Sequence, residues 1–243
     1  MTPRAATAAR SGRAVKDGSQ AGAKPDLSRA AIVERALSVM DVEGPDAVTI
    51  RRLAQEFGVT PMALYWHVAN KDELLAAMGD ALLDGIAPAV TTGAWSAQLR
   101  GVITALVDAM RRHPAAAELV LPRILVHPDG LRLTEFTLAV LEDAGFTVAQ
   151  AADLARTGLQ TAIMLVSQVP GAETQAAEEQ RDLLLKQKRD YIAGLEPTAF
   201  PHVREASFAL TDCADVDGYY GFGIDLFVAG SEALLRRHKR SPA

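Results

Sequence analysis

The 243-residue sequence contains a single cysteine, Cys213, and no long apolar run. One cysteine excludes a disulfide within the chain, which fits a reducing compartment such as the cytoplasm. A transmembrane helix needs roughly 18 consecutive apolar residues, and no stretch reaches that length. The charged N-terminus lacks the apolar segment of a secretory signal. We therefore expect a soluble, cytoplasmic protein with no membrane partner.

Patterns that carry enzyme chemistry are also absent from the sequence. The five histidines, at positions 67, 113, 127, 202 and 238, show no metal-ligand spacing. There is neither a Gly-x-Ser-x-Gly nucleophile motif nor a phosphate-binding glycine loop. The run from Asp215 to Gly218 follows a calcium-binding loop only in part, because Cys213 and Ile224 occupy two ligand positions. We predict that the protein is not an enzyme, needs no cofactor or metal, and does not use Cys213 as a redox sensor.

Charge is distributed unevenly along the chain, whose formal net charge is −5. Residues 1–29 carry six Lys and Arg against two Asp, whereas residues 76–243 carry 15 basic and 21 acidic residues. A nucleic acid would therefore meet mainly the first part of the chain. Residues 1–25 have no periodicity, and we predict a disordered basic tail. A passive extension is the favoured interpretation of this tail, and an arm that contacts phosphates is the alternative.

From residue 26 onward the apolar residues recur with the period of an α-helix, so the predicted fold class is all-α. A first domain, residues 26–87, has predicted helices at 28–43, 49–58, 60–68 and 70–86. A second domain, residues 88–243, has predicted helices at about 95–112, 115–124, 129–144, 147–169, 176–194, 201–211 and 217–238. The helices at 147–169 and 217–238 are too apolar for a surface helix, and we expect them to pair in a homodimer. Burial of both within one subunit is the alternative.

Two short helices joined by a tight turn are predicted between residues 49 and 68. Ile50, Leu53, Ala54 and Phe57 form the stripe of the first helix, which Thr49 can cap and Gly58 can end. Thr60 can cap the second helix, and Pro61 suits its first position. Leu64 and Val68 then share one face. This arrangement is typical of a helix–turn–helix that reads a DNA major groove.

The stretch LAQEFGVTPMALYWHVANKDELL, residues 53–75, resembles the DNA-binding domain of TetR-type transcriptional repressors. The resemblance covers residues 27–86 and continues more loosely into the family's C-terminal domain, mainly at 141–146 and 222–235. It implies a homodimeric repressor that binds a palindromic double-stranded DNA operator and is released by a small-molecule effector. A ligand-dependent activator with the same module remains the alternative.

The predicted DNA contacts lie on both helices of this motif. Thr60, Pro61, Met62 and Ala63 are near the start of the second helix, where short or apolar side chains can approach base edges. Tyr65, Trp66 and His67 cannot all face one core, and we expect Tyr65 and His67 to contact phosphates. Trp66 is either a contact or a packing residue. Lys71 is expected on the DNA backbone, and the resemblance implies that Arg51 contacts a base.

The effector site is less well marked in the sequence. In family members that bind a magnesium–tetracycline chelate, a His and a Glu hold the complex. The matching positions fall near Leu119–Val120 and Val166–Ser167, so we expect neither the metal nor this drug. The default expectation is an apolar pocket. Its candidate residues, for each of which core packing is the alternative, are Met110, Phe136, Met164 and Leu165, with His113 or Gln168 as the polar group.

Overall fold

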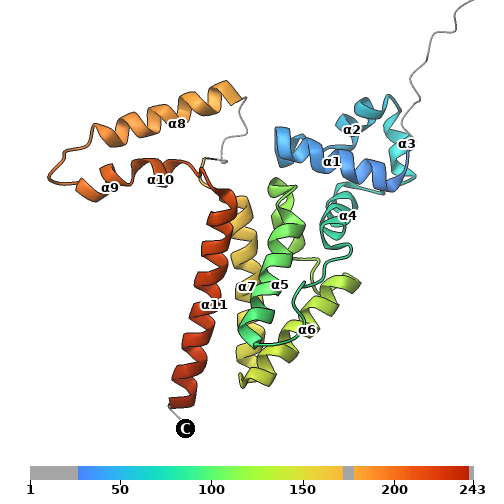
Figure 1. Cartoon of the computed structure of the whole chain (residues 1–243). Helices are drawn as coiled ribbons and strands as arrows, with labels where there is room; N and C mark the ends of the chain where they lie inside the picture. Colours follow the sequence, from blue (N-terminus) through green and yellow to red (C-terminus); the bar gives the residue numbers. More distant parts are fainter. Residues whose placement is uncertain (1–26, 172–177, 241–243) are drawn as a thin grey trace, which may run out of the picture.

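The first helices of the computed structural model form a small unit at one end of the molecule (Figure 1). The structure describes residues 27–171 and 178–240, so the predicted tail at 1–25 lies outside the described residues. This unit consists of α1 (Arg29–Glu43), the 3-10 turn η1 (Pro45–Ala47), α2 (Ile50–Phe57), α3 (Pro61–Tyr65) and α4 (Lys71–Leu83). Ile32, Leu53, Leu64 and Met78 are fully buried and hold these helices together.

Several predicted helix ends of this unit are confirmed. The Thr49 hydroxyl accepts the Arg52 backbone N–H (3.1 Å), and Gly58 ends α2 with φ +63°. Thr60 stands at the N-cap of α3, but its side chain makes no capping hydrogen bond, contrary to the prediction. Helix α3 also ends at Tyr65 rather than at Val68, because the chain tightens into a turn in which the N–H groups of His67 and Val68 share the Leu64 carbonyl.

The second part of the chain is also helical, and the described residues contain no β-strand. Its elements are α5 (Trp95–Met110), the 3-10 segment η2 (Pro114–Val120), α6 (Pro128–Ala144), α7 (Val148–Ser167), α8 (Glu178–Ala193), α9 (Pro201–Glu205), α10 (Ser207–Thr211) and α11 (Val216–Arg240). Helix α5 packs on α6, α7 and α11. The all-α prediction is confirmed, although η2 replaces the helix predicted at 115–124 and a break at Ala206 splits the helix predicted at 201–211.

One hydrophobic core connects the two parts. Helix α4 leaves the first unit and packs on η2, which also contacts α1. Buried residues of both parts, such as Met40, Met78, Met110 and Val120, belong to one cluster. A change in the position of η2 would therefore alter its contacts with both α1 and α4. No helix in the described ranges is sufficiently long and apolar to span a membrane.

Helices α8, α9 and α10 form an arm that projects from the junction of α7 and α11 (Figure 1). The arm helices pack mainly on one another. Asp212 anchors the base of the arm, because its carboxylate accepts the Arg189 guanidinium at 2.7 Å. The arm therefore extends into space that its own subunit does not fill.

Candidate nucleic-acid interface and ligand cavities

The turn between α2 and α3 positions the start of α3 on the surface of the first unit. Gly58 has φ +63°, which is the left-handed conformation that glycine adopts without strain. The Val59 N–H then donates to the Ala54 carbonyl at 2.9 Å and closes the end of α2. Pro61 occupies the first position of α3, where its missing N–H costs nothing. Buried Leu64 and Val68 keep α3 seated on the unit.

The nine side chains predicted to contact DNA lie on and around α2 and α3. The exposed ones are Arg51, Thr60, Pro61, Met62, Tyr65, Trp66 and Lys71, and the half-buried ones are Ala63 and His67. Trp66 is 86% exposed, so it does not pack against its own domain. Arg51 has no ion-pair partner among the residues that the structure describes, whereas Arg52 binds the carboxylates of Glu43 (2.7 Å) and Glu56. Within residues 27–171 and 178–240, the guanidinium of Arg51 is therefore not held by a carboxylate and is available to a partner.

Arg29 and Glu73 brace the segment that follows α3, a role that the sequence analysis missed. The Arg29 guanidinium donates to the His67 carbonyl (2.8 Å) and to the Glu73 carboxylate (2.5 Å). Glu73 also accepts the Ala69 N–H (2.7 Å), while Asn70 caps α4 by accepting the Glu73 N–H (2.8 Å). The hydrogen bond from Ala69 and the Arg29 guanidinium lower the pKa of Glu73. The capping-box spacing of Asn70 and Glu73 was visible in the sequence, but the long-range contact with Arg29 was not.

The six residues predicted to bind an effector do not surround one cavity. Met110 is fully buried in the core, and Phe136 and Leu165 are half-buried against it. Met164 is 60% exposed and Gln168 is exposed. His113 binds the Asp41 carboxylate of α1 through Nδ1 at 2.7 Å. This contact between His113 and Asp41 joins the segment after α5 to α1 of the first unit.

An apolar cavity of about 430 Å³ lies between α5, α6 and α7. Its lining residues are Leu99, Val102, Ile103, Leu106, Leu121, Ile124, Leu125, Leu133, Thr134, Thr137, Leu138, Ala152, Ala155, Arg156 and Leu159. The hydroxyls of Thr134 and Thr137 donate to backbone carbonyls of α6, and their oxygens remain acceptors. Arg156 supplies the one charge of the wall and pairs with Asp153. Sequence reasoning missed this cavity because its apolar residues repeat at the same helical spacing as ordinary core residues.

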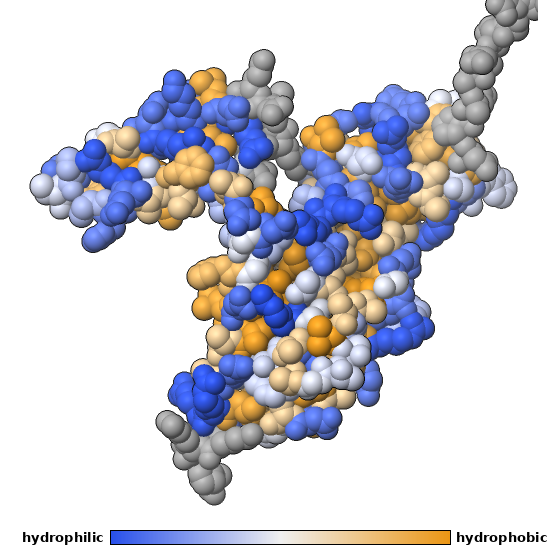
Figure 2. Space-filling view, in the orientation of Figure 1, coloured by the Kyte–Doolittle hydropathy of each residue, from blue (hydrophilic) through white to orange (hydrophobic). Residues whose placement is uncertain are grey.

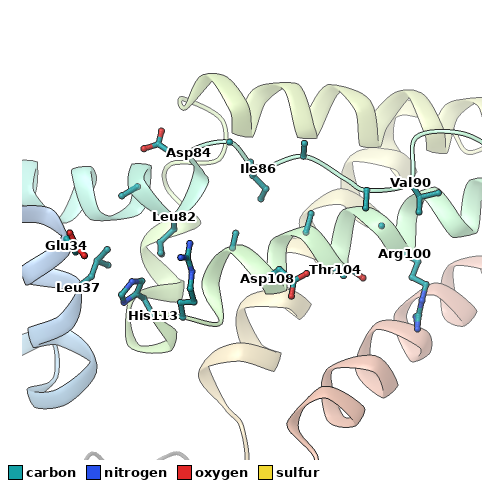
Figure 3. Close-up of a pocket in the computed structure, with 18 of the residues that line it drawn as sticks. Glu34, Leu37, Leu82, Asp84, Ile86, Val90, Arg100, Thr104, Asp108 and His113 are labelled. Carbon is teal, nitrogen blue, oxygen red and sulfur yellow. The ribbon is translucent and has the colours of Figure 1, made fainter. Parts of the chain in front are cut away.

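A second cavity, of about 740 Å³, lies where the two parts meet (Figure 3). We call it the junction cavity. It is bounded by α1, the end of α4, the linker at residues 84–90, and the outer face of α5. His113 lines it, and none of the other five predicted effector residues does.

Both parts of the chain match family models. Residues 32–78 match the model of bacterial regulatory proteins of the tetR family, and residues 87–235 match the tetracyclin repressor-like C-terminal domain. An HTH-type transcriptional regulator of Saccharopolyspora erythraea is 33% identical over 128 residues, which cover 52% of this chain and 54% of that protein. The HTH-type transcriptional repressor DrrR1 of Streptomyces coeruleorubidus is 27% identical over 250 residues, covering 91% of this chain and 83% of DrrR1.

Solved structures are similar over most of the chain. ActR of Streptomyces coelicolor, in complex with actinorhodin, is 28% identical with a TM-score of 0.61, covering 86% of this chain and 98% of ActR. BioQ of Mycobacterium smegmatis is 27% identical with a TM-score of 0.57, covering 86% of this chain and 99% of BioQ. BioQ with its natural double-stranded DNA operator is 25% identical with a TM-score of 0.53, covering 85% and 98%.

Proposed function

The chain belongs to the TetR family of bacterial regulatory proteins, and we propose that it is a transcriptional repressor that binds a palindromic DNA operator as a homodimer and is released by a small-molecule effector. The observation that carries the proposal is the exposed surface around α3, where Met62, Tyr65 and Trp66 are 67%, 48% and 86% exposed. Three large side chains close together in sequence thus leave about half or more of their surface exposed in the free protein. Their exposure favours a partner that covers them.

In the proposed complex, helix α3 enters a major groove of the operator. Residues 60–63 form its first turn, and recognition helices contact base edges with their N-terminal residues. The apolar side chains of Pro61, Met62 and Ala63 suit thymine methyl groups. Arg51 and Lys71 are exposed on either side of α3 in sequence and supply charge for a base edge or a phosphate. The structure of BioQ with its operator supports this mode of binding.

A homodimer is supported by the apolar outer face of α7 and α11. Met164, Phe222, Leu226 and Leu234 are 60%, 71%, 65% and 49% exposed on these two helices. Figure 2 shows apolar surface along the outer side of α11, below the arm. A contiguous face of this kind is typical of an interface. A second copy related by a twofold axis would cover it and place two α3 helices for the two halves of a palindrome.

The arm supports the same dimer. Leu183, Tyr191, Phe208 and Leu210 are 54%, 73%, 50% and 56% exposed on it. Because the arm projects from the side of α7 and α11, a copy that docks on these helices lies beneath it (Figure 1). The apolar surface of the arm then continues the interface onto the second subunit.

The apolar cavity is the proposed effector site. Its volume of about 430 Å³ lies in the range of small-molecule pockets. Its walls suit an apolar ligand, and Arg156, Thr134 and Thr137 can orient a carbonyl or hydroxyl group. The complex of ActR with actinorhodin supports a small-molecule effector in this family. This site replaces the residue set that the sequence suggested.

Polar contacts connect the wall of the apolar cavity to α4. Arg123 follows the lining residue Leu121 and binds the Asp80 carboxylate twice, at 2.7 and 2.9 Å. His127 Nε2 lies 3.2 Å from the Asp84 carboxylate, and Asp129 accepts the Gly85 N–H at 2.8 Å. An effector that moves the 121–129 segment would therefore shift α4 and, with it, the rest of the first unit (α1 to α4), which is the proposed DNA-binding unit. The effector needs only to bind the conformation in which the 121–129 segment has moved more tightly than it binds the DNA-binding conformation.

Selection of bound duplexes from a random DNA pool, at about 0.15 M salt, tests the proposal. The expected result is enrichment of an inverted repeat whose half-sites lie roughly one helical turn, or a multiple of it, apart. Tyr65→Ala should lower the amount of bound duplex about tenfold on all sequences without changing the enriched repeat, and Leu131→Ala, a change of a similarly exposed side chain on α6 (46% against 48% for Tyr65), should leave both unchanged. Binding that depends on salt but enriches no sequence would contradict the proposal.

A further inference from the structure

We propose that the junction cavity is a second effector site, which takes flat aromatic amines and alters the position of the DNA-binding unit. The inference rests on the proposed function, but it concerns a different site. The lining of the junction cavity shares no residue with that of the apolar cavity. The two lie on different faces of α5, so that α5 separates them.

The α5 wall of the junction cavity contains a stripe of small residues beside Arg100, Thr104 and Asp108. Ala97, Gly101, Ala105 and Ala109 follow one another at intervals of four residues on one helix face. Val90 of the linker already packs on this face at Gly101, where an added Cβ would lie 3.3 Å from the Val90 Cβ, so the part of the stripe left open is that of Ala105 and Ala109. The linker forms the opposite wall with Ile86 and Val90 (Figure 3). Beyond the contact of Val90 with Gly101, the small side chains of Ala105 and Ala109 leave space for the face of a planar aromatic ring.

The polar groups of the junction cavity identify the second feature of the ligand. Three of its charged groups are already engaged, since Asp84 faces His127, Arg100 pairs with Asp225 and Asp108 with Arg111. Figure 3 shows Arg100 pointing away toward α11. These groups therefore contribute little to recognition.

Two opposite charges in the wall have no ion-pair partner within the described part of the chain. They are the Glu34 carboxylate on α1 and the Arg112 guanidinium beyond α5. Glu34 lies at the end of the cavity closed by Leu37 and His113 (Figure 3). An amine can donate to this carboxylate, while the face of an aromatic ring can receive the guanidinium. The pair thus fits an aromatic amine better than an anion or an aliphatic chain.

The cavity lies beside the contact that orients the DNA-binding unit. Asp41, one turn after Leu37 on α1, accepts the Ala115 N–H (3.3 Å) and binds His113 (2.7 Å). A ligand between Glu34 and α5 touches both sides of this contact. Its binding therefore favours the angle between α1 and α5 that best fits the ligand, which changes the spacing of the two α3 helices in a dimer.

The test is a fluorescence titration of the full chain with 9-(methylaminomethyl)anthracene, a flat aromatic amine, without DNA. Glu34→Gln removes only a charge at an exposed position and should weaken binding about fivefold. Ala105→Phe fills the cavity and should weaken it by at least about tenfold. Ala155→Phe, which narrows the apolar cavity, is the matched control and should leave the affinity unchanged. The anionic 9-anthracenecarboxylate should bind more weakly than the amine.

Circular dichroism melts establish that each variant is folded. The proposal is overturned if Glu34→Gln and Ala105→Phe both bind the amine as the parent chain does, or if Ala155→Phe abolishes binding. Because the titration contains no DNA, its result stands even if no operator is found. Hydrogen exchange at α1 then reports movement of the DNA-binding unit, and exchange unchanged by saturating amine would also overturn the proposal.

Discussion

Glu73 joins three segments of the DNA-binding unit through one carboxylate. It accepts the backbone N–H of Ala69 and the guanidinium of Arg29, and its own N–H is held by Asn70. Arg29 in turn holds the His67 carbonyl. The positions of the three large side chains at 65–67 therefore depend on Glu73, which is not among the predicted DNA contacts.

This arrangement predicts a pH dependence of stability. The pKa of Glu73 lies below its ordinary value of 4.5 in the folded chain, so ionised Glu73 stabilises the fold above that value. This stabilisation is lost as the pH falls through the folded pKa. The free energy of unfolding, measured with urea between about pH 5 and pH 3, should fall more steeply for the parent chain than for Glu73→Gln. Parallel pH curves would contradict the assigned role.

Arg51 and Tyr65 should differ in how they affect DNA binding. Tyr65→Ala should weaken binding about tenfold on all sequences, because a phosphate contact carries no base information. Arg51→Ala should cost about 1–3 kcal/mol and relax the preference at one base position. Competition between operator and single-base variants measures both effects.

Arg52→Ala is the control for the Arg51 substitution, since Arg52 is already engaged by Glu43 and Glu56. It should leave base preference unchanged. If Arg51→Ala and Tyr65→Ala also leave operator affinity unchanged at moderate salt, the DNA-binding face has been placed wrongly.

At the scale of elements, the contact between α4 and η2 determines how the two parts communicate. A Cβ built on Gly79 would lie 2.5 Å from the Leu119 carbonyl oxygen, so only glycine allows this approach. The next residue of α4, Asp80, forms a bidentate ion pair with Arg123, and the side chains of this pair are about two-thirds buried. Helix α4 is therefore held to η2 by both shape and charge.

A double-mutant cycle on Asp80 and Arg123 tests this coupling. Each alanine substitution should lower the free energy of unfolding, because it leaves a partly buried charge without its partner. The double variant should lose less than the sum, with a coupling energy of about 1–3 kcal/mol. Urea unfolding of the four proteins measures it. A coupling energy near zero would mean that packing at Gly79 alone holds α4.

Helix ends were predictable where the signal is local. Caps at Thr49 and Asn70 and the turn at Gly58 use side chains and backbone within four residues. The end of α3 was not predictable in this way. Val68 is buried and the Arg29 guanidinium binds the His67 carbonyl, and both contacts involve residues or surroundings outside the local sequence. In the same way η2 is a 3-10 segment because it fits between α1 and α4, a constraint that its own sequence does not contain.

At the scale of the whole molecule, the dimer is the property most open to test. Phe222→Asp combined with Leu226→Asp places two charges on the exposed face of α11 and should raise the dimer dissociation constant by at least about a hundredfold. Sedimentation velocity measures this shift, and operator affinity should fall with it. Leu131→Asp, a similar change on exposed α6, should leave the dimer intact. A double variant that remains dimeric would exclude this interface.

The sequence by itself determined the all-α class, the family and the residues of the helix–turn–helix, because periodicity, caps and turn residues act over a few positions. Only the tertiary structure decided which apolar residues enclose a cavity. Met110 and Leu106 have the same spacing and chemistry on α5, yet one lies in the solid core and the other lines the apolar cavity. The neighbours of each residue come from α6, α7 and the linker. These elements are distant from α5 in sequence, so the local pattern of α5 contains no information about them.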